Sequence, residues 1–506
     1  MLDLGRTFLQ SVERSPGAVA LVDDASRFTY AEWFERIRRV AGGLAGMNLG
    51  RGDHLLVVLQ NRWEMATLHW ACQFLGVVIT PLNWRAKADE IEYCAVDADA
   101  KAVVFEGVSA EAVAGCAHAQ RVPRIAVGGA PGGTLAFESL LDAARAEPLL
   151  GATAEDFSVM LYTSGTTGKP KGVPRRHRAE RAAALAHVAQ NLHGRGERTL
   201  GVMPLYHTMG VRSLLSSALV DGTFACMPRF EAGAALRIIS GERISNLYLV
   251  PTLYHDLLAH ADFTPQAVAS VTKLGFAGAP MHDALVHRLV AAFRPQLFVN
   301  HYGSSEIYTF TIDQDAARKP GSAGRAGINA RIRVVRLDAK GADDVAPQGV
   351  EGQIVADLSG DEAFEGYWKR PDADAKALRG GWYFTGDTGY IDAEGDLFVS
   401  GRVDDMIISG GENISPVDIE SVLSLHPAVD EVSVAGLKDE RWGQRVVAFV
   451  KRKGDVDAAA LDAHCKTSDL VNFKRPREYV FVREIPKSPV GKILRRKLVA
   501  GEYEPE

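Results

Sequence analysis

A segment rich in glycine, threonine and lysine occupies residues 162–172 and reads Tyr-Thr-Ser-Gly-Thr-Thr-Gly-Lys-Pro-Lys-Gly. It follows an apolar run at 157–161 that is expected to form a buried strand. Glycines let backbone N–H groups approach phosphate oxygens closely, hydroxyl groups donate hydrogen bonds, and the two lysines add positive charge. The sequence therefore predicts a loop that binds the phosphates of a nucleotide. The residues expected to make these contacts are Thr163, Ser164, Gly165, Thr166, Thr167, Gly168 and Lys171.

This loop differs from the P-loop of Walker-type nucleotide hydrolases. A P-loop has four residues between its glycines and a serine or threonine after its lysine. Here two threonines separate Gly165 from Gly168, and Lys169 is followed by a proline. The predicted nucleotide chemistry therefore belongs to another class of enzyme.

Seven further short motifs follow the loop. In chain order they are Met-Pro-Leu-Tyr-His (203–207), Phe-Ala-Gly-Ala (276–279), Tyr-Gly-Ser-Ser-Glu (302–306), Tyr-Phe-Thr-Gly-Asp (383–387), Gly-Arg-Val-Asp-Asp (401–405), Ser-Gly-Gly-Glu-Asn-Ile (409–414) and Pro-Lys-Ser-Pro-Val-Gly-Lys (486–492). Each motif alone is weak evidence, but seven in this order are specific. Over nearly its whole length the sequence resembles the adenylate-forming superfamily, which contains acyl-CoA synthetases, nonribosomal adenylation domains and firefly-type luciferases.

The resemblance implies an ATP site with assigned residues. Tyr302 would present an aromatic face to adenine, and Asp387 would accept hydrogen bonds from the two ribose hydroxyls, with Arg402 reaching the same ribose. Glu306, together with Thr166, would bind Mg²⁺, which prefers hard oxygen ligands beside substrate phosphates. The remaining residues that the resemblance places at ATP or AMP are Gly278, Ala279, Gly303, Ser304 and Ser305.

The resemblance also implies catalytic, hinge and coenzyme A residues. Lys492 matches the catalytic lysine, a compact charge able to bridge the acyl oxygen and the α-phosphate. His207 is expected to gate the acid side of the site rather than act as a base, because a carboxylate is already ionised at neutral pH. Asp404 matches the hinge about which the C-terminal domain turns. The coenzyme A path would involve Gly410, Gly411, Glu412, Trp442, Phe473, Lys474 and Arg475.

The chain departs from the common family pattern just after the phosphate loop. Many relatives continue there with a hydrophobic residue and Ser/Thr-His, whereas this chain has Arg175 and Arg176 before His177. These arginines add positive charge near the predicted exit of the polyphosphate, and the sequence assigns them no role.

The residues that would surround the acid favour an aromatic or other compact hydrophobic substrate. Amino-acid adenylating domains carry an aspartate one residue after the position of His207, and this chain has Thr208, which disfavours an α-amino acid. The C-terminal motifs look most like those of benzoate and chlorobenzoate ligases. The pocket residues implied by the resemblance are mostly apolar or aromatic with a few hydroxyls: Ala186, His207, Thr208, Met209, Tyr248, Ala277, Gly278, Gly303, Ile307, Tyr308 and Thr309.

The predicted function is that of an acid–thiol ligase, which converts a carboxylate, ATP and coenzyme A to acyl-CoA, AMP and diphosphate, with Mg²⁺ as cofactor. Three alternatives stay open: a medium-chain fatty acyl-CoA ligase, a standalone adenylation enzyme that loads a carrier protein, and a luciferase-like monooxygenase. Assays with different acids and thiol acceptors separate the first two from an aryl-CoA ligase, and oxygen uptake with luciferin would reveal the third.

The hydrophobic pattern that must position these motifs alternates between strands and helices. Strands at 55–59, 77–79 and 102–106 enclose helices at 63–74 and 88–97, and the alternation continues to a strand at 296–299. After about residue 320 shorter β segments punctuated by glycine follow. The sequence predicts an α/β fold: an N-terminal domain (1–402) of parallel-rich sheets flanked by helices plus a β subdomain, and a small mobile α+β C-terminal domain (403–506).

Composition and charge fit an enzyme that acts on small molecules. The chain has 506 residues, 47% of them hydrophobic, and 57 basic against 63 acidic side chains give a net charge of −6. Nothing here predicts binding to nucleic acid or to a membrane, and a cytoplasmic location is expected. The five scattered cysteines favour reduced thiols over disulfides or a zinc site. The expected partners are the carboxylate, ATP and coenzyme A, and a homodimer is left open.

Overall fold

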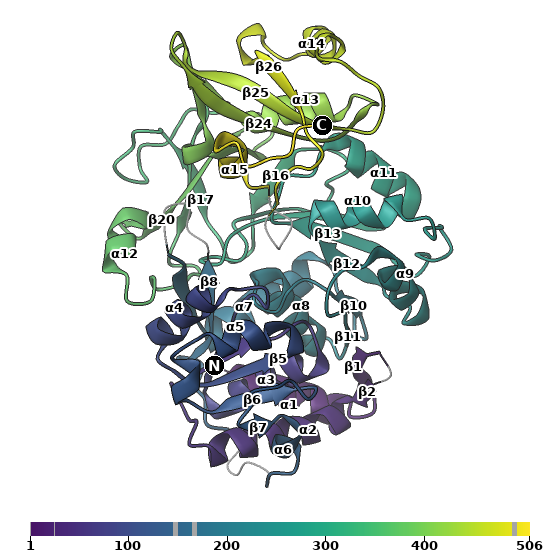
Figure 1. Cartoon of the computed structure of the whole chain (residues 1–506), viewed down its shortest axis with the longest axis vertical. Coiled ribbons are helices and arrows are strands. Elements are labelled where there is room, and N and C mark those ends of the chain that lie inside the picture. Colours follow the sequence, from purple (N-terminus) through teal and green to yellow (C-terminus); the bar gives the residue numbers. More distant parts are fainter. Residues whose placement is uncertain (1, 25, 145–149, 164–168, 488–492) are drawn as a thin grey trace.

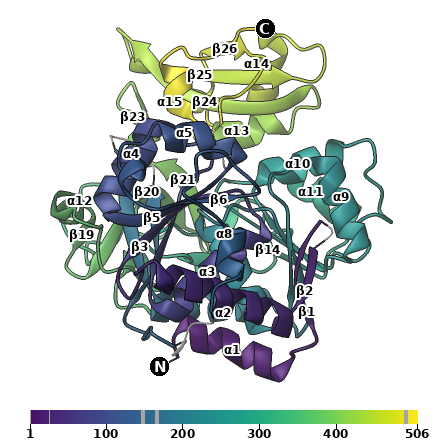
Figure 2. The same cartoon turned by 60° about the horizontal axis from the view of Figure 1, so that its bottom comes forward.

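The computed structural model describes residues 2–24, 26–144, 150–163, 169–487 and 493–506 (Figure 1). Its body contains two large sheets, and a smaller sheet near the C-terminus caps one end of the body in both views (Figures 1 and 2). The α/β class predicted from the alternating pattern is confirmed. Among the described helices, none combines the length and the apolar composition needed to cross a bilayer.

The first sheet has the strand order β7-β6-β5-β3-β4-β8-β9 and is parallel except for its last pair. Its strands are β3 (His54–Val58), β4 (Val78–Pro81), β5 (Ala100–Glu106), β6 (Arg124–Val127), β7 (Leu135–Ala136), β8 (Phe157–Thr163) and β9 (Lys171–Arg176). The phosphate loop predicted from the sequence joins β8 to β9, which run antiparallel. This sheet therefore holds both ends of the loop.

Helices cover both faces of the first sheet, because side chains of a strand point alternately to its two faces. On β3, Leu55 and Val57 pack into one cluster with α1 (Leu4–Arg14), α2 (Tyr30–Gly46) and α3 (Trp63–Leu75). Leu56 and Val58 pack into another with α4 (Ala88–Ala98) and α5 (Ala110–Ala114). The near-continuous apolar run of β3 is thus explained by burial on both sides.

The second sheet changes character along its length. Strands β1 (Val19–Asp23), β11 (Thr223–Cys226), β10 (Arg198–Gly201), β12 (Asn246–Leu249), β13 (Lys273–Ala277) and β14 (Leu297–Tyr302) are mutually parallel, with β2 (Ser26–Thr29) antiparallel at the edge. Beyond β14 the pairs are antiparallel: β15 (Thr311–Asp313), β16 (Ser322–Ala326), β21 (Leu397–Arg402), β20 (Trp382–Ile391), β18 (Gly352–Asp357) and β17 (Ile332–Val335), with β19 (Leu378–Arg379) beside β20. The glycine-punctuated segments after residue 320 form this antiparallel part.

Among the described residues, five longer α-helices and two short ones complete the body. Helices α9 (Ala232–Gly241), α10 (Pro251–Ala259) and α11 (Asp283–Phe293) pack on the parallel strands through one buried cluster. Helices α7 (His177–Gln190) and α8 (Thr208–Leu219) contribute to the cluster that also contains α3 and β8. The short helices are α6 (Glu138–Leu141) and α12 (Pro371–Ala377).

The C-terminal segment forms its own five-stranded sheet with two helices in its main apolar cluster. Its elements are β22 (Ile407–Ser409), β23 (Glu412–Ile414), α13 (Pro416–Ser424), β24 (Val429–Asp439), β25 (Gly443–Arg452), α14 (Ala458–Thr467), β26 (Glu478–Phe481) and α15 (Arg495–Val499). It meets the body through a few polar contacts. His255 of α10 lies 3.3 Å from the Asp430 carboxylate of β24, and the Ser415 hydroxyl donates to the Ser400 carbonyl.

Candidate active site

The predicted site residues gather at one edge of the body, because the carboxyl ends of parallel strands lie at the same edge of a sheet. Ala277 ends β13, Tyr302 ends β14, and Thr163 ends β8 of the other sheet. His207 follows β10 and precedes α8, and its Nδ1 accepts a hydrogen bond from the Met209 amide at 3.4 Å. The structure thus brings together motifs that are more than a hundred residues apart.

A hydrogen-bonded cluster joins three residues assigned to the nucleoside. The Tyr302 hydroxyl donates to one carboxylate oxygen of Asp387 at 2.6 Å, and Arg402 donates to the other at 2.8 Å. Antiparallel pairing of β20 with β21 sets Asp387 opposite Arg402. Burial and the adjacent Asp387 raise the pKa of Tyr302 well above its usual value, so the phenol stays a donor. The cluster fixes both the aromatic ring and the carboxylate.

Glu306 is buried in a tight loop between β14 and β15. The loop is closed by hydrogen bonds from the Ser304 amide to the Ile307 carbonyl and from the Phe310 amide to the Tyr302 carbonyl. The Tyr367 hydroxyl donates to the Glu306 carboxylate at 2.6 Å. The Lys171 ammonium lies 4.0 Å from the centre of the Tyr367 ring, and burial lowers its pKa while the charge of Glu306 opposes that shift. A carboxylate and a lysine therefore face the same region.

Tyr367 is a site residue that sequence reasoning missed. Tyr367 belongs to none of the sequence motifs, and its role depends on its contact with Glu306, 61 residues earlier in the chain. A tyrosine hydroxyl on one carboxylate oxygen orients the other oxygen, which is what a single carboxylate ligand of a cation needs.

Two site glycines have different structural reasons, a close contact at Gly303 and a positive φ at Gly278. A Cβ atom on Gly303 would lie 2.1 Å from the Tyr308 carbonyl oxygen, so no other residue fits the loop that carries Glu306. Gly278 follows β13 with φ +85°, a conformation that favours glycine. Ala279 lies directly after it. These positions keep the backbone open at the edge of the sheet.

The structure does not place Arg175 and Arg176 at an exit for polyphosphate, where we expected their charge. Arg175 is fully buried and forms an ion pair with Glu180 at 2.8 Å. It also donates to the backbone carbonyls of Glu306 at 2.8 Å and Glu362 at 2.6 Å. Arg176 instead forms two hydrogen bonds with the exposed Glu365. Alternation along β9 explains the difference, since adjacent side chains point to opposite faces.

The residues predicted to surround the acid span a gradient of exposure. Gly278 and Gly303 are exposed and His207 is half-buried, whereas Tyr248 and Thr309 are buried. The other members, Ala186, Thr208, Met209, Ala277, Ile307 and Tyr308, are buried as well. This gradient runs from the edge where the nucleoside cluster lies into the body between α8 and β12.

A buried arginine that the sequence reasoning missed contacts the deep members of this set. Arg212 of α8 donates to the Thr309 hydroxyl at 2.6 Å, to the Tyr308 carbonyl at 3.3 Å and to the Tyr248 hydroxyl. It lies four residues after Thr208 on the same helix, so the two share a helix face. This spacing was the only signal in the sequence that could have found it.

The residues assigned to coenzyme A lie in the C-terminal segment, in the turns beside β22 and β25 and around the short 3-10 helix Asn472–Lys474. The Gly410 amide donates to the Trp442 carbonyl at 2.9 Å, and Gly411 and Glu412 are exposed beside it. Trp442 and Phe473 are exposed aromatic side chains. Lys474 and Arg475 form ion pairs with Asp418 and Asp462, at 2.6 Å and 2.8 Å, within the same segment.

Some predicted residues cannot be placed. Residues 164–168 of the phosphate loop and Lys492 lie outside the described residues, as does the side chain of Asp404. In the part of the chain that is described, Thr163 and Lys171 mark the two ends of the loop, and they pair across β8 and β9.

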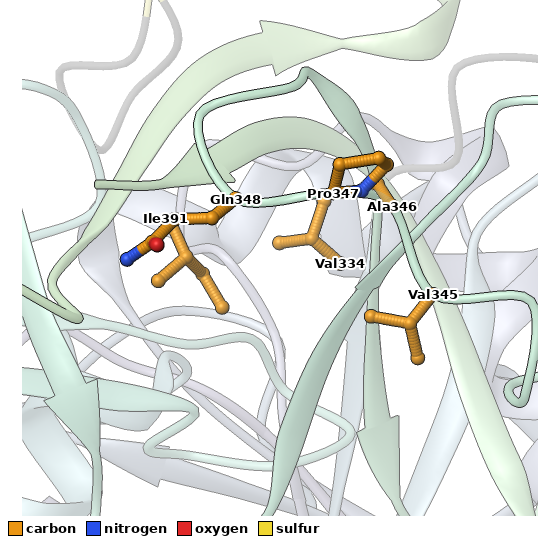
Figure 3. A pocket seen from close by; sticks show the side chains of 6 residues that line it. All are labelled: Val334, Val345, Ala346, Pro347, Gln348 and Ile391. Carbon is orange, nitrogen blue, oxygen red and sulfur yellow. The ribbon is translucent and has the colours of Figure 1, made fainter. Parts of the chain in front are cut away.

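Two surface cavities in the described part of the chain include few of the predicted site residues. One, of about 190 Å³, is lined by Val334, Val345, Ala346, Pro347, Gln348 and Ile391 in the antiparallel part of the second sheet (Figure 3). The other, of about 390 Å³, runs along α7 and includes Ala186 and Asn329. The first cavity contains none of the predicted site residues. The described residues contain no group of three or more His, Cys, Asp or Glu arranged to hold a metal.

Comparisons with known proteins agree with this arrangement. A model of the AMP-binding enzyme family matches residues 8–368, and a model of its C-terminal domain matches residues 418–492. The chain belongs to the AMP-binding enzyme family. The two matched regions together include the phosphate loop, Glu306 and Lys492, while Asp387 and Arg402 lie between them.

Individual members of the AMP-binding family match almost the whole chain. A 4-chlorobenzoate–CoA ligase of an Arthrobacter species is 34% identical over 96% of this chain and 93% of its own. A long-chain-fatty-acid–CoA ligase of Mycobacterium tuberculosis is 33% identical over 98% of both chains. The crystal structure of a benzoate CoA ligase from Burkholderia xenovorans superimposes with a TM-score of 0.90, at 25% identity and over 99% of this chain and 100% of that one. Relatives of similar identity thus act on aromatic and on fatty acids.

Proposed function

We propose that the protein is an ATP-dependent, AMP-forming ligase that joins a compact aromatic acid to coenzyme A through an acyl-adenylate. The observation that carries the proposal is the pairing of two clusters at one edge of the body. Tyr302, Asp387 and Arg402 form a rigid group suited to a nucleoside. Glu306 and Lys171 lie beside it with the charges that a magnesium-bound polyphosphate requires.

Asp387 has the chemistry of a ribose ligand. An ionised carboxylate only accepts hydrogen bonds, and the contacts with Tyr302 and Arg402 hold this carboxylate in place. The two vicinal hydroxyls of a ribose are donors that such a group can accept. Tyr302 then offers its ring face to the adenine while its hydroxyl anchors the carboxylate.

In the first step a carboxylate oxygen of the acid attacks the α-phosphorus of ATP, and the bond to the β-phosphate breaks to release diphosphate. This step needs stabilisation of charge around phosphorus. Lys171 supplies a positive charge at one end of the phosphate loop, and we assign Lys492 to the acyl and α-phosphate oxygens. Glu306 fits Mg²⁺, because this ion takes one or two carboxylates and otherwise phosphate and water oxygens. When bound, Mg²⁺ would neutralise phosphate charge.

In the second step the coenzyme A thiol sulfur attacks the acyl carbon, and AMP leaves with the former carboxylate oxygen. We assign the exposed segment Gly410, Gly411 and Glu412, with Trp442 beside it, to the pantetheine path. This assignment requires the segment 403–506 to turn about Asp404 between the two steps.

A screen of diphosphate release with different acids tests the proposal. The series is benzoate, substituted benzoates, furoate, cyclohexanecarboxylate, medium-chain fatty acids and palmitate. The best single-ring acid should exceed palmitate in kcat/KM by about 10-fold or more, which corresponds to about 1.4 kcal/mol of discrimination. Equal or better turnover of palmitate would reject the aromatic substrate. Transfer to a carrier protein but not to coenzyme A would reject the ligase in favour of a standalone adenylation enzyme.

A further inference from the structure

Only two arginines are buried in the described part of the chain, and their surroundings differ. Arg175 is 0% exposed and pairs with Glu180 at 2.8 Å. Arg212 is 2% exposed, and no described carboxylate lies within 4 Å of its guanidinium. A buried charge without a paired opposite charge is costly, so a protein retains one where something else completes it.

On one edge of the Arg212 guanidinium, the Nε group lacks a partner among the described residues. Its Nη1 group donates to Thr309 and to the Tyr308 carbonyl, and Nη2 donates to the Tyr248 hydroxyl. Nε is buried and has no hydrogen-bond partner among the described residues. Nε and the adjacent Nη form the fork with which arginine binds a carboxylate in a bidentate manner. The fork therefore has donor capacity that the protein leaves unused.

No group around Arg212 forms a direct ion pair with it in the described structure. His187 and His301 pack beside Tyr248, and burial together with the Arg212 charge lowers their pKa well below the usual value, so they are neutral. Glu362 is a buried carboxylate whose pKa is raised by burial and lowered by the charge of Arg212, but its hydrogen bond comes from Asn329.

The position of Arg212 matches the far end of a ring-sized acid. His207 caps the start of α8 near the nucleoside cluster, and Arg212 lies five residues further along. Five residues of α-helix rise about 7.5 Å. This is about the length of a benzene ring with two para substituents. Tyr248, Tyr308 and Thr309, all predicted to surround the acid, are the residues that Arg212 touches.

We propose that Arg212 selects the acid, and that the preferred substrate is a single-ring acid with an oxygen acceptor at the end remote from the reacting carboxylate, most favourably a second carboxylate. This inference rests on the proposed function and narrows its substrate class. The remote group binds the Nε and Nη2 edge of Arg212, and a carboxylate there forms the direct ion pair that the buried guanidinium lacks. An apolar para substituent leaves that edge unpaired.

The test compares benzoate, 4-chlorobenzoate, 4-hydroxybenzoate and benzene-1,4-dicarboxylate in diphosphate release, with wild type, Arg212→Met and Arg212→Lys. A charge-assisted pair should give the dicarboxylate a kcat/KM about 10- to 150-fold above that of 4-chlorobenzoate in wild type. Arg212→Met should abolish or reverse this ratio, and Arg212→Lys, which keeps the charge but loses the fork, should give an intermediate ratio. Ratios of two acids on one preparation do not depend on the fraction of folded enzyme.

The outcomes separate this inference from the proposed function. A wild-type preference for 4-chlorobenzoate, or a ratio that Arg212→Met and Arg212→Lys leave unchanged, would show that Arg212 has only a structural role. If Arg212→Met does not fold, the ratio with Arg212→Lys decides in the same way. Absence of diphosphate release with every acid, in the presence of ATP and coenzyme A, would instead reject the proposed function.

Discussion

Replacing Arg175 by methionine tests how much the buried ion pair between Arg175 and Glu180 stabilises the fold around Glu306. The guanidinium pairs with Glu180, and both side chains are 0% exposed. It also donates to the Glu306 and Glu362 carbonyls, and it lies 4.2 Å from the centre of the Tyr308 ring. Arg175→Met keeps an unbranched side chain in place of the aliphatic part of arginine but removes every one of these donors.

The expected loss of unfolding free energy follows from the burial of Glu180, the partner of Arg175. Without Arg175, Glu180 keeps only the Tyr308 hydroxyl as a donor in the described structure, at 3.1 Å. Breaking a buried pair from one side costs about 3–5 kcal/mol, because the remaining charge is left uncompensated. This is a large fraction of the roughly 5–15 kcal/mol that stabilises a typical folded domain.

The adjacent residue provides a matched control. Arg176 pairs with Glu365, which is 46% exposed, and such surface pairs contribute at most about 1 kcal/mol. Chemical denaturation of Arg175→Met, Arg176→Met, Glu180→Gln and the Arg175→Met/Glu180→Gln double variant measures the difference. The double variant should be more stable than the sum of the single losses predicts, since it leaves no unpaired charge. Equal destabilisation by Arg175→Met and Arg176→Met, or additive losses in the double variant, would refute the reasoning.

Three further predictions concern the site and its surroundings. Glu306→Gln keeps the size of the side chain but removes its charge, so the rate of adenylate formation should fall by roughly 10²-fold or more. A near-wild-type rate at ordinary Mg²⁺ concentration would show that Glu306 has only a structural role. Lys492→Ala should slow adenylation by about 10²- to 10⁴-fold yet still convert supplied acyl-adenylate to acyl-CoA, whereas Gly411→Leu should slow only the second of these steps. Single-turnover rates measure each step separately, and an equal fall in both steps for both variants would contradict a C-terminal domain that turns between them. The pKa of His255 is raised by its contacts with Asp256 and with Asp430 of β24. The stabilising effect of protonated His255 is therefore present below about pH 6.5 and is lost as the pH rises through the folded-state pKa. Wild type should thus unfold at a higher temperature than His255→Gln at about pH 6 but not at about pH 8. A difference in unfolding temperature that does not change with pH would contradict a role for the charge of His255.

The pattern of the chain was enough to predict the elements that carry the motifs. Strands β3, β5 and β8 and helices α3 and α4 lie within a few residues of where hydrophobic periodicity places them. Periodicity can be recognised from neighbouring residues, because an element that is buried on one or both faces carries apolar residues at regular positions in the sequence. The nucleotide motifs are local in the same sense, because a phosphate loop or a tight turn uses neighbouring residues.

The tertiary structure alone decided the charged interior of the site. Arg212 reaches Tyr248, 36 residues away, and Thr309, 97 residues away, while Arg175 reaches Glu306 across 131 residues. In the sequence these arginines look like any other charged residues, and charged side chains are usually solvated. Their burial follows from which face of β9 and α8 packs inward, and the identity of the partners follows from the packing of distant elements. No pattern along the chain encodes either one, because the free energy of a buried charge depends on the groups that surround it in space.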